Sequence, residues 1–232
     1  MFESKYSKLL TILLILGIVL IVGGLATTGI IIMNNANTKQ EAENAVDNFQ
    51  NNINKEDNDE EKNNNEQEEP NDNTISNEIK PIVGVENTII DNNTSNESTN
   101  NYKGFPMVGT IEIPAINLKY PVLEDASKSA IEVAVGIYDG PGLNKIGNTT
   151  IAGHNYRDGR FFSNNKKLVE GDKVHITDTT GKKITYIIYK IYTTSPEDSS
   201  YLDRNTNGKR EISLTTCTDD SQSRLIIWAK EQ

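Results

Sequence analysis

One cysteine, one histidine and one arginine are the residues of this chain whose types could together carry out covalent chemistry. Cys217 is the only cysteine in 232 residues, and Arg224 follows it by seven positions, within EISLTTCTDDSQSRLIIWAK (211–230). A thiolate is a nucleophile, an imidazole can accept and return its proton, and a guanidinium can stabilise developing negative charge. Cys217 as nucleophile, His154 as acid and base, and Arg224 as oxyanion or substrate clamp therefore make a complete set for acyl transfer.

An unpaired cysteine also has a simpler explanation, as a small buried hydrophobic side chain. Two features favour a reactive role for Cys217. The domain is expected to lie outside the cell, where exposed thiols oxidise and most cysteines are paired, so a lone thiol stands out. Cys217 also lies among polar neighbours rather than in an apolar run: Thr215, Thr216, Thr218 and Asp219.

The two histidines of the chain differ in their surroundings. His154 follows the apolar run TTIAG and precedes the polar loop NYRDGRFF, whereas His175 lies inside the expected strand KVHIT. An exposed or core role is the default for a histidine within a strand, so His154 is the better acid/base candidate. Two histidines and one cysteine at these spacings match no zinc pattern, and we expect no metal and no cofactor.

The elements that must position these residues are short strands separated by turn signals. The expected strands are 108–113, 118–123, 148–153, 173–177, 183–192, 211–218 and 224–231, with one or two helical turns at 129–135. This pattern predicts an all-β barrel or sandwich. Cys217 ends the penultimate strand, Arg224 begins the last, and His154 ends an earlier one. All three side chains are therefore expected at one rim of the sheet.

The amino-terminal part of the chain predicts a membrane anchor. Leu9 to Met33 is a run of 25 residues without a charge, long enough to cross a bilayer core of about 30 Å. A cleaved signal peptide is the alternative, but its apolar region is usually shorter and GLATTG is a poor cleavage site. Lys5 and Lys8 precede the run, so we expect residues 1–8 in the cytoplasm, residues 9–33 across the membrane and the rest outside.

The segment 34–103 differs from the rest of the chain in composition. Asparagine fills 21 of the 68 positions in 34–101, and residues 34–103 hold 16 Asp/Glu against 5 Lys. So little apolar surface predicts a disordered, extended extracellular linker. Residues 104–232 hold 16 Lys/Arg and 16 Asp/Glu, enough chain for one neutral domain. No basic stripe marks a nucleic-acid surface.

Four segments, in order, resemble sortases, the membrane-anchored cysteine transpeptidases of Gram-positive bacteria. SLTTC (213–217) is similar to their TLxTC signature, with Ser213 in place of the first Thr. Arg224 matches the arginine of the following strand. TIAGHN (150–155) resembles their histidine segment, and VGTIEIPAINLKYPV (108–122) resembles their entry strands. The resemblance covers about residues 108–230.

The resemblance implies an eight-stranded β-barrel and a specific reaction. Cys217 would attack the Thr carbonyl of an LPxTG-like sorting signal, and His154 would protonate the leaving amine and deprotonate the incoming one. Arg224 would bind the substrate backbone or the oxyanion, and Thr216 is a candidate for shaping the substrate site. The acceptor would be an amine, typically on a peptidoglycan precursor. Loops after Pro121 and in 193–209 should read the signal.

The subclass of sortase stays open at this point, and three alternative protein classes have to be weighed. The chain lacks the lid and second span typical of pilus-assembling class C, which leaves a class D-like, class B-like or housekeeping enzyme.

L,D-transpeptidases keep His and Cys close together, whereas His154 and Cys217 are 63 residues apart. NlpC/P60 peptidases place Cys before His. A non-enzymatic surface β-domain, an adhesin or binding module, would share the anchor and the barrel but have an inert Cys217.

Overall fold

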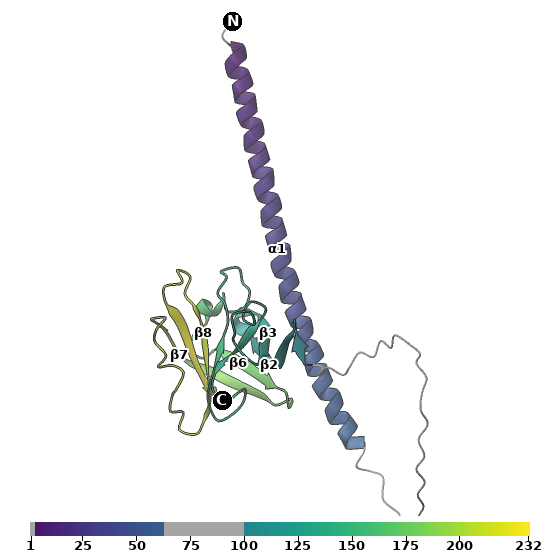
Figure 1. Ribbon diagram of the computed structural model, residues 1–232, viewed down its shortest axis with the longest axis vertical. Helices are drawn as coiled ribbons and strands as arrows, with labels where there is room; N and C mark the ends of the chain where they lie inside the picture. Colours follow the sequence, from purple (N-terminus) through teal and green to yellow (C-terminus); the bar gives the residue numbers. More distant parts are fainter. Residues whose placement is uncertain (1–2, 63–99) are drawn as a thin grey trace, which may run out of the picture.

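The computed structural model describes residues 3–62 and 100–232 of the chain. In these two stretches the chain forms a long helix, α1 (Glu3–Lys62), with a β-barrel beside it (Figure 1). Two short 3₁₀ helices, η1 (Pro114–Ile116) and η2 (Asn165–Lys167), connect strands. The strands of the described residues are β1 (Asn101–Tyr102), β2 (Phe105–Ile113), β3 (Leu118–Leu123), β4 (Val135–Asp139), β5 (Gly147–Ala152), β6 (Lys173–Asp178), β7 (Lys183–Thr194), β8 (Arg210–Cys217) and β9 (Arg224–Glu231).

Strands β2 to β9 close into an eight-stranded barrel, which confirms the expected fold. Their order is β2-β3-β4-β5-β8-β9-β7-β6, and β6 pairs back with β2. The two-residue β1 pairs with the start of β2, at Phe105 and Pro106. The pairs β3–β4 and β5–β8 are parallel, and the others are antiparallel. The parallel β5–β8 pair brings the carboxyl ends of both strands to the same end of the barrel.

The helical turns expected at residues 129–135 are present as hydrogen-bonded turns that do not extend into a helix. At residues 129–135 the chain makes hydrogen-bonded turns, with the amide of Ile131 donating to the carbonyl of Ser127 at 3.0 Å. The helical turn ends there because β4 begins at Val135 and pairs in parallel with Val122 of β3. The two short helices of the described residues are η1 and η2 instead.

The expectation of a disordered linker over 34–103 is wrong for residues 34–62, which continue α1 without a break. Four apolar side chains at helical spacing lie on one face of this part: Ala42, Val46, Phe49 and Ile53. All are at most 8% exposed, and they pack against the barrel. The Asn- and Glu-rich average of the segment concealed this stripe, whose spacing of four, three and four residues is that of a helix face. Residues 63–99 of the predicted linker lie outside the described residues.

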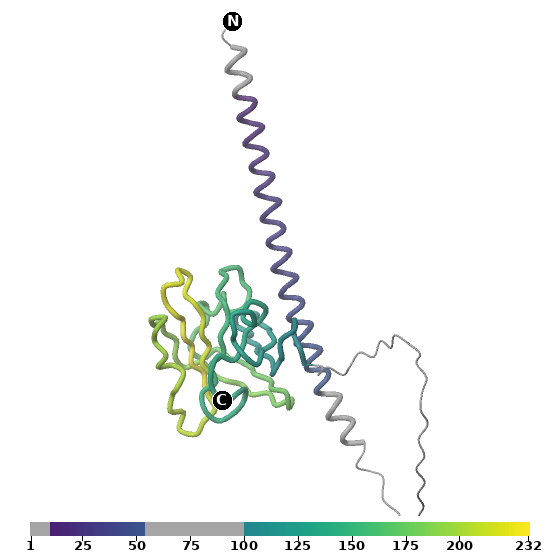
Figure 2. Tube along the Cα trace, in the orientation of Figure 1, coloured from purple at the N-terminus to yellow at the C-terminus, as the bar shows by residue number. Residues whose placement is uncertain are grey.

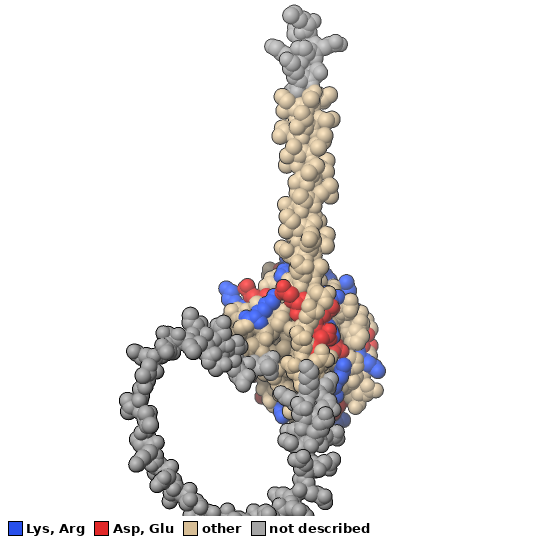
Figure 3. Space-filling model, turned by 90° about the vertical axis from the view of Figure 1, so that its right-hand side faces the viewer, with Lys and Arg blue, Asp and Glu red and all other residues tan. Residues whose placement is uncertain are grey.

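The upper half of α1 has the properties expected of a membrane anchor. Among the described residues, one helix is long and apolar enough to cross a bilayer, with its most apolar stretch near the amino terminus. Its large apolar side chains face outward, from Leu10 at 70% to Met33 at 66% exposed. Figure 3 shows no Lys, Arg, Asp or Glu in the described stretch of this half, from Leu10 to Met33. Outward-facing apolar side chains on all sides favour lipid over water as the surrounding medium.

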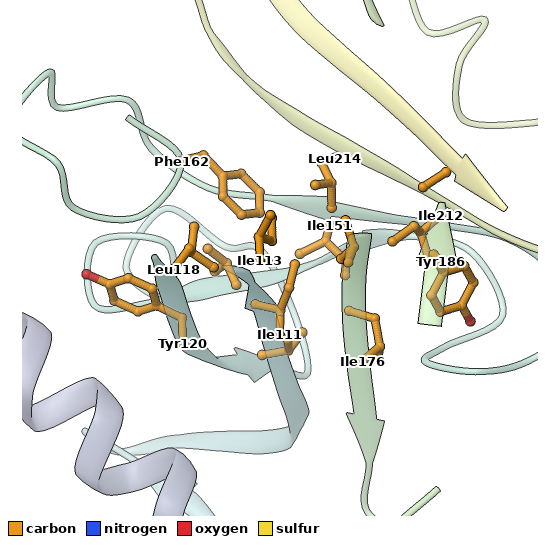
Figure 4. Packing of buried hydrophobic residues seen from close by; sticks show 14 of the residues in the cluster. Ile111, Ile113, Leu118, Tyr120, Ile151, Phe162, Ile176, Tyr186, Ile212 and Leu214 are labelled. Carbon is orange, nitrogen blue, oxygen red and sulfur yellow. The ribbon is translucent and has the colours of Figure 1, made fainter. Parts of the chain in front are cut away.

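The barrel interior is filled by inward-facing side chains that alternate along the strands (Figure 4). Ile111 and Ile113 of β2, Ile151 of β5 and Leu214 of β8 are all fully buried. Burial of such a side chain stabilises the fold by about 1.5–3 kcal/mol. Phe162, which lies in the loop after β5, is 1% exposed and joins the same cluster. The core therefore holds the loop that carries the candidate histidine.

Candidate active site

The β8–β9 hairpin places Cys217 and Arg224 side by side. The two residues form the last register pair of the antiparallel strands, directly across from each other. Cys217 is a free thiol, and both residues are partly exposed. Directly opposed residues on antiparallel strands have Cβ atoms about 5 Å apart. The sequence prediction that both residues lie at one end of the sheet is confirmed.

His154 reaches the same rim through the parallel pairing of β5 with β8. Ala152 pairs with Thr215, and the amide of Gly153 donates to the carbonyl of Thr215 at 3.2 Å. The backbone at Gly153 approaches its neighbours closely: an added Cβ would lie 2.8 Å from Val135 and 2.9 Å from Phe162. Any larger residue would push the chain outward and move the imidazole of His154 away from the rim.

The residues after His154 are tied to the β8–β9 turn. The side-chain amide of Asn155 donates to the carbonyl oxygen of Cys217 at 3.0 Å and to the carboxylate of Asp219 at 2.9 Å. A guanidinium nitrogen of Arg157 donates to the hydroxyl of Ser221 at 2.9 Å. These bonds fix the histidine loop relative to Cys217. Sequence reasoning missed Asn155, although its place beside a candidate catalytic histidine was a signal.

All four residues expected at the site line one groove. It has a volume of about 280 Å³, and its lining includes His154, Thr216, Cys217 and Arg224. Its other lining residues are Ala126, Ile131, Tyr138, Ala152, Gly153, Pro196, Tyr201 and Thr215. His175 lies away from the groove, on β6, with its Nδ1 2.9 Å from the hydroxyl of Thr185. The choice of His154 over His175 thus agrees with the geometry.

The walls of the groove come from the two regions that the sequence indicated. Ala126 and Ile131 lie after Pro121, and Pro196 and Tyr201 lie in the β7–β8 loop. Tyr201 is 6% exposed and forms a fixed surface. Tyr138, by contrast, is 55% exposed, so its ring is available to an extended peptide in the groove.

Burial lowers the pKa of His154 from its ordinary value of 6.5, and the negative charge of Glu132 offsets this in part. The imidazole is therefore neutral at pH 7 and can accept a proton. Its ring lies 4.9 Å from the ring of Tyr156, centroid to centroid. In the described part of the chain no hydrogen bond joins the imidazole to the thiol of Cys217. Substrate-free catalytic groups often tighten their contacts only when substrate binds.

Arg224 faces the groove without a carboxylate that would occupy it. Among the described residues no ion pair includes its guanidinium; the charge of Arg224 contributes only weakly to the lowered pKa of the exposed Glu197. Arginine carries five donors in a planar fork and stays protonated at neutral pH. The guanidinium beside Cys217 is thus free to donate to a carbonyl or an oxyanion.

Thr215 and Thr216 bring two unpaired hydroxyls to the groove. They are 6% and 4% exposed, and within the described structure neither Oγ1 has a hydrogen-bond partner. Leaving a buried hydroxyl unpaired costs about 1–3 kcal/mol, so both hydroxyls are poised to bond a polar group that enters the groove. The sequence singled out Thr216 and missed Thr215.

No cluster of three or more His, Cys, Asp or Glu side chains suited to a metal occurs in the described stretches. Asp219 and Asp220 follow Cys217, and hydrogen bonds lower the pKa of both, chiefly from Lys166 to Asp219 and from Thr218 to Asp220. These carboxylates are therefore engaged in holding the β8–β9 turn.

A buried ion pair holds the β7–β8 loop that forms the groove wall. Arg204 bonds to Glu211 at 2.6 Å and to the side-chain oxygen of Asn148 at 2.7 Å, and it lies 4.1 Å over the ring of Trp228. The side chains of the pair are only 9% and 12% exposed. Burial, and then the carboxylate of Glu211, raise the pKa of Tyr189 to about 12, which keeps it a neutral donor to that carboxylate.

Replacement of Arg204 by alanine is expected to lower the free energy of unfolding by about 3–5 kcal/mol, because Glu211 would stay buried without its cation. The midpoint of urea unfolding, followed by the fluorescence of Trp228, measures this. Lys183→Ala is the control: Lys183 pairs with Glu112 but is 49% exposed. Exposed pairs contribute about 0–1 kcal/mol. Equal midpoint shifts in the two variants would contradict a structural role for the Arg204 pair.

Comparison with known proteins places the chain in a family. Its residues 111–232, slightly more than half of the chain, match the sortase domain model. It is 27% identical to sortase A of Streptococcus agalactiae and 30% identical to sortase D of Bacillus subtilis, over 54% and 53% of this chain. The matches span 53% and 62% of those two relatives.

A solved structure agrees with the sequence relatives. The sortase D5 transpeptidase of Clostridium perfringens is 29% identical, with a TM-score of 0.50, and the match covers 55% of this chain and 79% of that one. The four segments that resemble sortases, the closed barrel and the match to the sortase domain model agree with one another. The chain belongs to the sortase family.

Proposed function

We propose that this protein is a cysteine transpeptidase that cleaves an LPxTG-like sorting signal after Thr and joins the released carboxyl group to an amine. The observation that carries the proposal is the meeting of Cys217, His154 and an unpaired Arg224 in one groove. These are a nucleophile, an acid/base and an oxyanion donor, as acyl transfer requires.

In the first step Sγ of Cys217 attacks the carbonyl carbon of the Thr residue in the signal. The S–C bond forms while the thiol proton passes to His154, which is neutral at pH 7 because burial lowers its pKa. Arg224 donates to the oxyanion. The C–N bond then breaks, His154 gives the proton to the leaving amine, and a thioacyl-enzyme remains.

In the second step an amine of the acceptor attacks the thioester carbon. The new C–N bond forms, the C–S bond breaks, and the proton of the amine passes through His154 back to Sγ of Cys217. Bond making and breaking balance, so one peptide bond is exchanged for another. The unpaired hydroxyls of Thr215 and Thr216 would bond the substrate backbone beside the scissile bond.

The apolar half of α1 supports a place at the cytoplasmic membrane. Lys5 and Lys8, which precede the apolar run, favour an amino terminus inside and a barrel outside. Secreted proteins that carry the sorting signal would be the substrates there. An amino group of a peptidoglycan precursor, exposed at the same surface, would be the acceptor.

Intact mass spectrometry of the full chain in detergent micelles tests this function. The chain is mixed with LPxTG-like peptides, with and without triglycine. We expect a mass increase equal to the peptide fragment through Thr, and triglycine should remove it while a joined product forms. A folded chain that forms no adduct, and whose thiol also resists iodoacetamide, would instead be a non-enzymatic surface β-domain.

Arg224→Lys is expected to reduce turnover by about 10²-fold, because a point charge cannot reproduce the planar fork and oxyanion donors contribute about 10²–10³-fold. Arg210→Lys is the matched control, since Arg210 begins β8 at the far end from Cys217. Turnover of a quenched fluorescent signal peptide measures both variants. If Arg224→Lys cleaved the peptide at the wild-type rate, the planar guanidinium of Arg224 would not be needed for the reaction.

A further inference from the structure

The barrel lies on α1 in a defined orientation, which two contacts establish. Lys39 of the helix lines a small cavity together with Gly159 and Phe161, from the loop that follows His154. Fourteen residues further along, Ile53 touches the β6–β7 turn, where a Cβ added to Gly181 would lie 2.6 Å from Cγ2 of Ile53. The histidine loop is therefore at the end of the barrel nearer to the apolar half of the helix.

The trace in Figure 2 shows the same arrangement. The β8–β9 turn and the histidine loop lie at the end of the barrel that faces the amino-terminal half of α1, and the β6–β7 turn lies at the opposite end. Arg157 and Ser221 link the two loops at the first end. The catalytic rim thus points along the helix towards its membrane-spanning part.

The distance from this rim to the membrane follows from helix geometry. The apolar run ends at Met33, and Lys39, the first charged residue after it, is six residues later, which is about 9 Å along a helix. The headgroup layer adds about 5–8 Å on each side of the hydrocarbon core. If Met33 marks the edge of that core, the loop that carries His154 lies at the outer edge of the headgroups.

The contact between α1 and the barrel is extensive enough to hold this orientation. Beside the apolar stripe of α1 (Ala42, Val46, Phe49 and Ile53), Gln50 donates to Glu112 at 3.0 Å. Ion pairs join Glu41 to Lys103 at 2.7 Å and Asp47 to Lys119. Glu41 is only eight residues after Met33, and the helix continues without interruption between them. Within the described residues, a continuous helix therefore connects the apolar half of α1 to the surface that packs against the barrel.

We propose that α1 acts as a ruler: it holds the catalytic groove towards the bilayer at a fixed height of about 10 Å, and so makes the spacing between scissile bond and membrane a determinant of specificity. This inference rests on the proposed function. The preferred substrate is a signal displayed at headgroup level, a few residues from its own membrane anchor. A signal held further out meets the groove less often.

The orientation can be measured without any activity. Because Cys217 is the only cysteine, Cys217→Ala gives a background in which one new thiol takes a fluorophore. Ser221→Cys labels the rim, and Thr180→Cys labels the β6–β7 turn. The full chain is placed in nanodiscs whose lipids carry a headgroup quencher. We expect at least about twofold stronger quenching at position 221; equal quenching, or stronger quenching at 180, would overturn the orientation.

The ruler is tested by lengthening it. A seven-residue alanine-rich helical insert after Asn35 raises the barrel by about 10 Å and turns it by only about 20°. The substrate is one signal peptide in two forms, soluble or joined by a short spacer to a transmembrane helix in the same nanodisc. We expect unchanged turnover of the soluble form and at least a tenfold loss on the anchored form.

A longer substrate spacer distinguishes an effect of the height of the groove from damage to the enzyme. Three extra extended residues in the substrate spacer reach about 10 Å further and should restore cleavage by the lengthened enzyme. If wild-type and lengthened enzymes cleave every anchored peptide equally, the ruler is wrong. Absence of soluble-peptide turnover in the wild type would instead contradict the proposed function, and the quenching result would still report the orientation.

Discussion

Replacement of Cys217 by alanine is expected to abolish thioacyl-enzyme formation and to reduce turnover by at least about 10⁴-fold. The thiol is the nucleophile of the proposed reaction, and loss of a nucleophile in a comparable covalent mechanism costs about 10⁴–10⁶-fold. Cys217 is the last residue of β8 and partly exposed, so removal of one sulfur should leave the barrel intact. Intact mass spectrometry and peptide turnover measure the two effects.

The control for Cys217→Ala is its free energy of unfolding, measured by urea denaturation, which should equal that of the wild type within about 0.5 kcal/mol, as for most surface substitutions. A folded variant without adduct and without turnover would establish the thiol as nucleophile. Transfer of the peptide to triglycine by the folded alanine variant would show that the reaction does not pass through Cys217.

Replacement of His154 by glutamine is expected to reduce turnover by about 10²–10⁴-fold, the usual contribution of a general acid/base. Glutamine preserves much of the volume and polarity but cannot exchange a proton near pH 7. His175→Gln is the matched control, because it removes the other histidine of the chain, from β6, and should leave turnover unchanged. A similar loss in both variants would contradict the assignment of His154.

The pH dependence follows from the direction of the pKa shift. Burial lowers the pKa of His154 below 6.5, so the neutral form predominates at pH 6.5 and above and the protonated form accumulates only at lower pH. Acylation that needs the neutral imidazole should therefore lose rate only as the pH falls below 6.5. Proton NMR of the two imidazoles, assigned with the glutamine variants, measures the pKa directly. A pKa above 6.5 for His154 would contradict this environment.

The site could be predicted because its residues stand at the ends of strands. Alternation of apolar residues marked 211–218 and 224–231 as neighbouring strands, and a short turn between them requires Cys217 and Arg224 to lie at the same end. The barrel confirmed that inference. His154 was harder to place, since its strand is joined to β8 by parallel pairing with 57 residues between the two strands, from 153 to 209.

Several residues in and around the groove could not be found from sequence. The place of Asn155 beside His154 marks it as a residue of interest, but its partners, Cys217 and Asp219, are more than 60 positions away and no local pattern identifies them. Tyr201 and Arg204 lie in a polar loop whose burial depends on the ion pair with Glu211. Long-range pairing of polar groups leaves little trace in local composition.

The sequence by itself determined the barrel class, the apolar run and the three reactive side chains, because strand alternation, helix length and residue chemistry are local properties. Only the tertiary structure decided that residues 34–62 are helical. Their apolar stripe gains stability only when a partner surface buries it, and β3 supplies that surface. The same packing turned an expected flexible tether into a fixed support, and thereby oriented the rim that carries Cys217 towards the apolar half of α1.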